Sequence, residues 1–204
     1  QYKAVATSVF REATNREFVI DQLKIRNDIN IEVFGLDRAK SLIFNEIIRR
    51  SGIDESKLAN TLISYLGTGS ISLSVYKKGI MEYTRNFSIG SMKLMEILNV
   101  THGSLDEYYT ALDEYIDSVL DKVVYENVNK SINNIVLSGS MVKTIAKQCG
   151  AETVDGSYRI KLEAMENFYN QVRKMPLDDM CEKFNVTTAD AELLYTASAL
   201  YIHL

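Results

Sequence analysis

The stretch from Ile63 to Val75 constrains the fold most, because it places two short β-forming runs on either side of a glycine-rich turn. Apolar and β-branched residues alternate with small ones on both sides of the turn, a pattern that predicts a hairpin. Glycines let backbone amides approach an anion closely, and hydroxyl donors stand beside them here. An ordinary hairpin turn explains the same residues. The candidate phosphate ligands in this turn are Gly67, Thr68, Gly69 and Ser70.

Length and charge limit the classes of protein to consider. The chain has 204 residues, 46% of them apolar, which is enough for one large domain or two small ones. Its net charge of -4 argues against general affinity for nucleic acid or an anionic membrane, although a local basic pocket fits within an acidic whole. The longest apolar runs are too short to span a membrane. Cys149 and Cys181 have neither a metal-ligand nor a disulfide spacing, which favours small core thiols in a reducing cytoplasm.

The start of the chain suggests a piece of a longer protein. There is no initiator Met, and residues 2–8 have the pattern of a strand interior. A helix capped by Asn15 is expected next, then a strand over 29–34 and a helix over 38–50. Three strands and a helix beginning near Ser91 follow.

Residues 104–129 have apolar side chains at spacings of three and four, which predict a helix. Acidic residues fall between the apolar ones. With no His beside them in this stretch, we expect a solvated helix face here rather than a metal cluster. The acidic residues are Asp106, Glu107, Asp113, Glu114, Asp117 and Asp121.

A second candidate loop follows the run 131–137, which we predict to be a short buried strand. Ser138, Gly139 and Ser140 then turn into a helix beginning near Met141. A strand, a small-residue turn and a helix N-terminus form a geometry that binds anions, although a plain strand-to-helix connection looks the same. The remainder predicts an extended segment at 158–160 and helices over 162–174, from 178 or 179, and over 189–204, the last capped by Thr187 or Thr188. This order of strands and helices predicts a mixed α/β domain.

Five motifs, taken together, resemble a known family. In order and spacing they resemble the exopolyphosphatase/guanosine pentaphosphate phosphatase (Ppx/GppA) family, over nearly the whole chain. The motifs are Ala-Val-Ala-Thr-Ser-x-x-Arg-Glu-Ala-x-Asn at 4–15, Ile-Glu-Val at 31–33, Gly-x-Gly-Ser at 67–70, Ile-Gly-Ser-Met-Lys-Leu at 89–94 and Ser-Gly-Ser at 138–140.

The resemblance implies an α/β, ribonuclease-H-like fold of the actin-like ATPase superfamily, with a mixed sheet flanked by helices. Residues 1–50 would be the C-terminal part of a first lobe, and residues 51–204 the second lobe. Family members hydrolyse terminal phosphoanhydride bonds of polyphosphate or of the pentaphosphate alarmone with a Mg²⁺-type ion. Arg11 and Lys93 stand at basic positions of the family pattern, which makes them candidate phosphate ligands.

The sequence also departs from the family at positions that carry its chemistry. Tyr65 stands where the metal-associated Asp belongs, and Ser72 where a Glu belongs. A phenol cannot replace a carboxylate as a ligand for Mg²⁺. In the segment that matches the family's catalytic acidic residues, Phe34–Lys40, only Asp37 is an acid, so it is the one candidate general base; a helix N-cap is the alternative role.

Three functions therefore stay open: a phosphoanhydride hydrolase, a non-catalytic relative that binds a phosphorylated ligand or a protein, and a kinase-like relative. The resemblance makes polyphosphate or a phosphorylated nucleotide the expected ligand, and it leaves a homodimer open. Because several separate parts of the family mechanism are missing, we predict that the 204-residue chain is inactive by itself.

Overall fold

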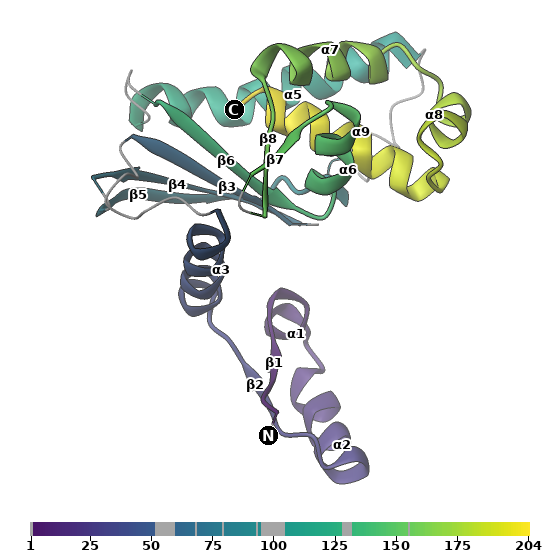
Figure 1. Ribbon diagram of the computed structural model, residues 1–204. Coiled ribbons are helices and arrows are strands. Elements are labelled where there is room, and N and C mark those ends of the chain that lie inside the picture. Colours follow the sequence, from purple (N-terminus) through teal and green to yellow (C-terminus); the bar gives the residue numbers. More distant parts are fainter. Residues whose placement is uncertain are drawn as a thin grey trace. The chain divides into compact units, whose positions relative to one another are not determined.

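A computed structural model describes residues 2–51, 60–67, 69–78, 80–92, 94, 105–127, 132–154 and 156–204. The chain forms two compact units (Figure 1), Gln1–Ile47 (unit 1) and Ile48–Leu204 (unit 2). The boundary falls inside helix α3 (Leu36–Ser51). Their assignment to two actin-like lobes stays a prediction.

Unit 1 contains a small parallel sheet. Strands β1 (Ala4–Ala6) and β2 (Ile31–Val33) pair in parallel, joined by α1 (Ser8–Glu12) and α2 (Arg16–Asn27). Parallel strands need such a crossover, because a tight turn cannot reverse the chain twice. Both strands are shorter than predicted, and β1 ends early because Ser8 already begins α1. Asn15 occupies the N-cap position of α2, but its side chain makes no capping hydrogen bond.

Unit 2 is built on a mixed four-stranded sheet in the order β5-β4-β3-β6. Strands β3, β4 and β5 are consecutive and antiparallel, so the predicted hairpin at residues 67–70 is confirmed. Strand β6 comes much later in the chain and lies parallel to β3. The strand bounds are β3 Thr61–Leu66, β4 Ile71–Lys77, β5 Ile80–Phe87 and β6 Asn134–Gly139.

Helices cover one face of this sheet (Figure 1). Because side chains alternate along a strand, Leu62 and Leu66 of β3 face the same way as Leu73 of β4, and all three join the main core. Leu112 and Ile116 of α5 are fully buried in the same core. The helices that supply the rest of it are α5 (Leu105–Asn127), α7 (Leu162–Val172), α8 (Leu177–Phe184) and α9 (Thr188–Ile202).

Two predictions about the β6 region are wrong. Strand β6 is not buried: it lies at the edge of the sheet, and Ile135 is 48% exposed. Ser138 and Gly139 do not form a turn, because they continue the ladder with β3; only Ser140 lies in the turn before α6 (Val142–Gln148). The expected extended segment at 158–160 is strand β8 (Ser157–Arg159). Its partner β7 (Glu152–Val154) was not predicted, because it is short and polar.

The N-terminus of α9 is capped by Thr187, one of the two predicted residues. The Asp190 amide donates to its Oγ1 at 3.2 Å. We expect Thr187→Ala to lower the free energy of unfolding by about 1 kcal/mol, since the amide loses its acceptor. Urea unfolding followed by circular dichroism measures this. Thr188→Ala is the matched control, and an equal loss in both variants would contradict the capping role.

Among the described residues, no helix is both long and apolar enough to cross a membrane. Cys149 and Cys181 are free thiols and half-buried. The cytoplasmic location stays a prediction.

Candidate functional site

The pairing of β3 with β6 brings the two candidate phosphate-binding segments to the same edge of the sheet. They are residues 67–70 (the first loop) and residues 138–140, where Ser138 and Gly139 end strand β6 and Ser140 lies in the turn; we keep the name second loop for this segment. In the parallel register Tyr65 lies beside Ser138, and Leu66 beside Gly139. The carboxyl ends of adjacent parallel strands are where ligands bind in open α/β sheets. The first loop is closed by a hydrogen bond from the Gly67 amide to the Ser70 carbonyl, at 2.9 Å. The two loops therefore form one continuous rim.

The first loop is also held from outside. The Ser91 amide donates to the Gly67 carbonyl at 3.3 Å, which fixes the start of the Ile89–Leu94 motif beside the turn. Gly69 is exposed, and a side chain added there would meet nothing within 4 Å. An anion can therefore approach the backbone at Gly69 without steric hindrance.

Below the loops, four polar side chains form a row across the sheet, one from each strand. The registers place Asn86, Ser72, Tyr65 and Ser138 side by side, and we refer to them as the polar row. The Ser72 hydroxyl donates to Asn86 Oδ1 at 2.7 Å, and Ser72 is 3% exposed. Ser72 is therefore a buried structural hydroxyl, whereas Tyr65 and Ser138 are only half-buried.

A tyrosine from α9 contacts the main chain of β6 at Ser138. The Tyr201 hydroxyl donates to the Ser138 carbonyl at 3.1 Å. Burial raises the pKa of the Tyr201 phenol, and the neighbouring Tyr65 raises it further. Gly139 leaves the space that this contact needs, because a Cβ there would lie 2.5 Å from the Tyr201 hydroxyl oxygen. The last turn of α9 thus contacts the second loop, which the ladder with β3 also holds.

The other candidate residues lie in unit 1. Arg11 Nη1 donates to the Phe34 carbonyl at 3.1 Å. Asp37 is exposed in the first turn of α3. Burial lowers the pKa of Lys40; the charge of Asp37 opposes this, and that of Arg11 adds to it. Arg11 and Asp37 therefore both influence the titration of Lys40 within unit 1.

Two candidate phosphate ligands, Thr68 and Lys93, lie outside the described residues. The structure therefore neither supports nor contradicts their predicted role.

The polar row does not suit a Mg²⁺ ion. Its side chains offer hydroxyl, phenol and amide oxygens, whereas Mg²⁺ is usually held through one or two carboxylates. Across the described part of the chain, no three His, Cys, Asp or Glu side chains are arranged to hold a metal ion. The Mg²⁺ that the resemblance implies therefore stays a prediction.

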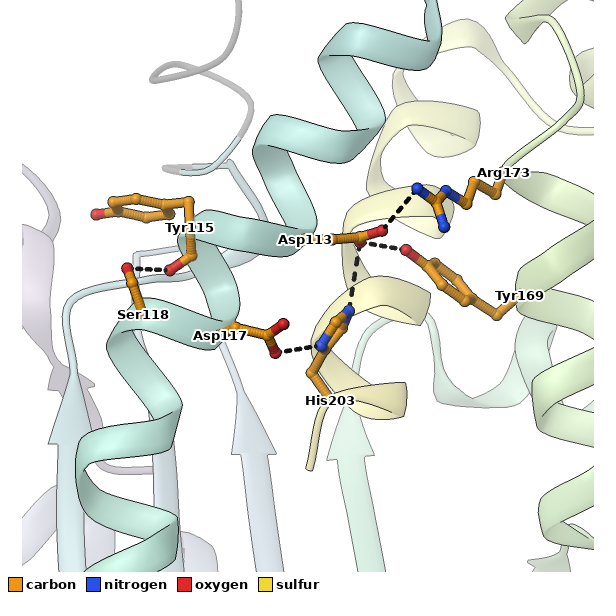
Figure 2. Close-up of polar contacts among 7 residues, drawn as sticks. All are labelled: Asp113, Tyr115, Asp117, Ser118, Tyr169, Arg173 and His203. Carbon is orange, nitrogen blue, oxygen red and sulfur yellow. Dashed lines mark hydrogen bonds and ion pairs between the residues drawn. The ribbon is translucent and has the colours of Figure 1, made fainter.

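A charged cluster that the sequence patterns do not predict lies between α5 and the end of α9 (Figure 2). Asp113 is not on a solvated face as predicted: its side chain is 15% exposed and lies 3.3 Å from His203 Nε2. Asp117 Oδ1 lies 2.6 Å from His203 Nδ1. Tyr169 donates to Asp113, and Arg173 Nη2 lies 3.4 Å from Asp113 Oδ2. The prediction missed this cluster because His203 is 86 and 90 residues away from the two carboxylates in sequence.

Within this cluster, His203 and Asp113 shift each other's pKa. The pKa of His203 is raised, chiefly by its hydrogen bond to Asp113 and then by Asp117, against the effect of burial. Burial alone would raise the pKa of Asp113, but hydrogen bonds from His203 and Tyr169 and the nearby cations lower it overall. Asp117 is nearer to His203 but 53% exposed, so the buried Asp113 has the larger effect.

A surface depression of about 440 Å³ lies on α5 beside this cluster. Glu107, Glu114 and Arg173 line it together with Thr110 and Ala111. None of the candidate phosphate ligands that the structure describes lines this depression. Its two carboxylates would repel a phosphate group, so the rim at the two loops remains the better candidate site.

Comparisons with solved structures give the fold. No protein-family model and no curated protein matches the sequence. A crystal structure of an exopolyphosphatase from Cytophaga hutchinsonii matches 98% of this chain with a TM-score of 0.79 and 18% identity, over 66% of its own length. The Aquifex aeolicus member of the Ppx/GppA family matches 98% of the chain with a TM-score of 0.77 and 17% identity, over 65% of its own length. An exopolyphosphatase-like protein matches with a TM-score of 0.75 and 17% identity.

The chain thus spans slightly less than two thirds of the first structures it matches. At such low identity the match establishes the fold, and activity has to be argued from the site. The chain has the mixed α/β fold of the exopolyphosphatase and Ppx/GppA structures, as its sequence motifs predict.

Proposed function

We propose that this chain binds the phosphate groups of polyphosphate or of a phosphorylated nucleotide at the rim formed by residues 67–70 and 138–140, and that it does not hydrolyse them by itself. The observation that supports this most is the parallel pairing of β3 and β6, which sets both small-residue loops at one edge of the sheet. A phosphate chain would meet hydroxyl and amide donors from both loops there.

The exposure of the loops agrees with this function. Gly69 and Ser140 are exposed, and Ser70 and Ser138 are half-buried. Donors that are partly buried interact with an anion more strongly than fully solvated ones, because less water competes for it. A ligand can therefore reach the exposed residues of the rim and still contact hydroxyl groups that are partly shielded from water.

The same site argues against hydrolysis by this chain. Phosphoryl transfer depends on positioning and on neutralising charge at the transferred group, and the polar row contributes no charged side chain. Asp37 is the remaining candidate base; it belongs to unit 1 and is exposed. The Mg²⁺ expected from the resemblance finds no carboxylate in the polar row, so we propose that phosphate binding does not depend on Mg²⁺.

A hydrolase is the second candidate function. It is favoured by the match of 98% of this chain to a structure described as an exopolyphosphatase. That structure is longer than this chain, so its remaining third could supply groups that this chain lacks. The homodimer and the choice between polyphosphate and nucleotide also belong to this proposal.

The two functions can be separated by measuring binding and turnover on the same chain. We expect isothermal titration calorimetry to show tripolyphosphate binding that is equal in Mg²⁺ and in EDTA, with no release of phosphate in Mg²⁺. Gly69→Glu should weaken binding about tenfold, since it adds a negative charge beside the bound anion. Thr153→Glu adds the same charge on the exposed strand β7 and should leave the affinity unchanged.

Several results would contradict this proposal. Mg²⁺-dependent phosphate release that Asp37→Ala abolishes would establish the hydrolase instead. Absence of tripolyphosphate binding, or equal losses in Gly69→Glu and Thr153→Glu, would remove the rim as the binding site.

A further inference from the structure

The last turn of α9 connects the second candidate loop with the charged cluster of Figure 2. Tyr201 donates to the Ser138 carbonyl, while His203, two residues later, lies between Asp113 and Asp117 of α5. A force that holds His203 against α5 therefore also holds Tyr201 against the loop.

The geometry at His203 specifies its protonation state. Its Nδ1 faces Asp117 Oδ1 at 2.6 Å, and its Nε2 faces Asp113 Oδ1 at 3.3 Å. A neutral imidazole carries one donor and one acceptor, whereas carboxylates only accept. Both contacts are hydrogen bonds only when both ring nitrogens carry protons, which makes His203 a cation here.

The neighbours of His203 respond differently when it loses this proton. From α7, Tyr169 donates to Asp113 and Arg173 pairs with it, so Asp113 keeps two partners. The rings of Tyr169 and His203 meet edge to face at 6.3 Å, and Tyr195 of α9 lies beside Tyr169 at 6.2 Å. On α5, one of the two carboxylates would then face a lone pair of His203. The contact between α9 and α5 consequently changes from attractive to repulsive at one point.

We propose that protonated His203 fastens the last turn of α9 to α5 and thereby holds Tyr201 against the second candidate loop, so that phosphate binding weakens as His203 loses its proton. This inference rests on the proposed function, because it concerns the regulation of the same rim.

The direction of the pH effect follows from the pKa shifts of His203 and Asp113. The pKa of His203 is raised in the folded chain, so its contribution is complete below the ordinary histidine value and disappears as the pH rises through the folded value. The pKa of Asp113 is lowered, so its contribution is complete above the ordinary aspartate value and disappears at lower pH. The contact between His203 and α5 is therefore complete between the ordinary pKa values of aspartate and histidine. At higher pH it is lost because His203 loses its proton.

The test compares the wild-type 204-residue chain with His203→Gln, Asp117→Asn and Glu114→Gln across pH 5.5 to 8.5. Glu114→Gln is the matched control, since it removes one exposed carboxylate from α5 next to Asp113. The chain has only two histidines, so proton NMR of the ring signals, assigned with His102→Gln, follows His203 directly. Tripolyphosphate affinity and the thermal midpoint are measured on the same samples.

We expect wild type and Glu114→Gln to lose about fivefold in affinity as His203 titrates, an ordinary size for coupling between two sites. Tripolyphosphate itself loses protons over this range, so each affinity is compared with that of His203→Gln at the same pH. The fivefold loss should appear in wild type relative to His203→Gln. Asp117 is half-exposed, so Asp117→Asn should fold, and its His203 should lose its proton at a lower pH.

Each other outcome counts against a different claim. A thermal midpoint that falls with His203 titration while affinity follows that of His203→Gln would overturn this inference and leave the proposed function standing. A His203 that titrates at or below the ordinary histidine value, or an unshifted value in Asp117→Asn, would overturn it as well. Absence of tripolyphosphate binding at every pH would remove the proposed function itself, and the inference with it.

Discussion

Replacing Gly139 by alanine should destabilise the chain by about 3 kcal/mol, because the added methyl group has no space. Its Cβ would lie 2.5 Å from the Tyr201 hydroxyl oxygen, 2.8 Å from the Leu66 carbonyl oxygen and 3.2 Å from Leu66 Cβ. The Leu66 carbonyl belongs to the neighbouring strand and cannot move without disturbing the ladder between β3 and β6. Urea unfolding of the purified variant measures the loss.

The matched control is Gly69→Ala in the first candidate loop, where an added Cβ meets nothing within 4 Å. Its stability should equal that of wild type within about 0.5 kcal/mol. Tyr201→Phe removes the atom nearest to the added methyl group. The double variant Gly139→Ala/Tyr201→Phe should therefore lose less stability than the sum of the losses in the two single variants. Equal stabilities of Gly139→Ala and Gly69→Ala would contradict the close packing of Gly139 against Tyr201 and Leu66.

Truncating Leu112 should have a similarly large effect through a cavity. Leu112 of α5 is 0% exposed and belongs to the core that α5 and α9 build on the sheet. We expect Leu112→Ala to lower the free energy of unfolding by about 3 kcal/mol, since a buried leucine loses its packing and leaves a void.

Chemical denaturation of Leu112→Ala and Leu162→Ala side by side tests this. Leu162 is 69% exposed in the first turn of α7, so its truncation should change stability by less than about 0.5 kcal/mol. A loss at Leu112 no larger than that at Leu162 would mean that α5 does not pack on the sheet as described.

The sequence predicts the local parts of this fold well and the distant pairings poorly. The hairpin around residues 67–70 follows from the glycines and from alternation within a short window. The pairing of Ser138 with Tyr65 was not predicted, because register between distant strands depends on packing that no local pattern records. Ser138 and Gly139 were predicted as a turn for the same reason: small polar residues favour turns unless a neighbouring strand extends them.

In the candidate site, too, the local features could be predicted and the distant contacts could not. Glycines and hydroxyls at the two loops could be identified from the sequence, and so could the missing carboxylates at Tyr65 and Ser72. The charged cluster could not, since His203 meets Asp113 only when the last helix packs on α5. A histidine at the penultimate position of the sequence is not distinctive until its neighbours are known.

The position of β6 also determines when the rim can exist during folding. Strands β3 and β4 meet across a short turn, whereas β3 and β6 meet only after about 70 intervening residues are closed into a loop, at a greater cost in chain entropy. An intermediate that contains the local hairpin alone has the first loop but not the second beside it. Only chains that have completed this long-range pairing carry both halves of the rim, so the proposed binding would report on the completeness of folding.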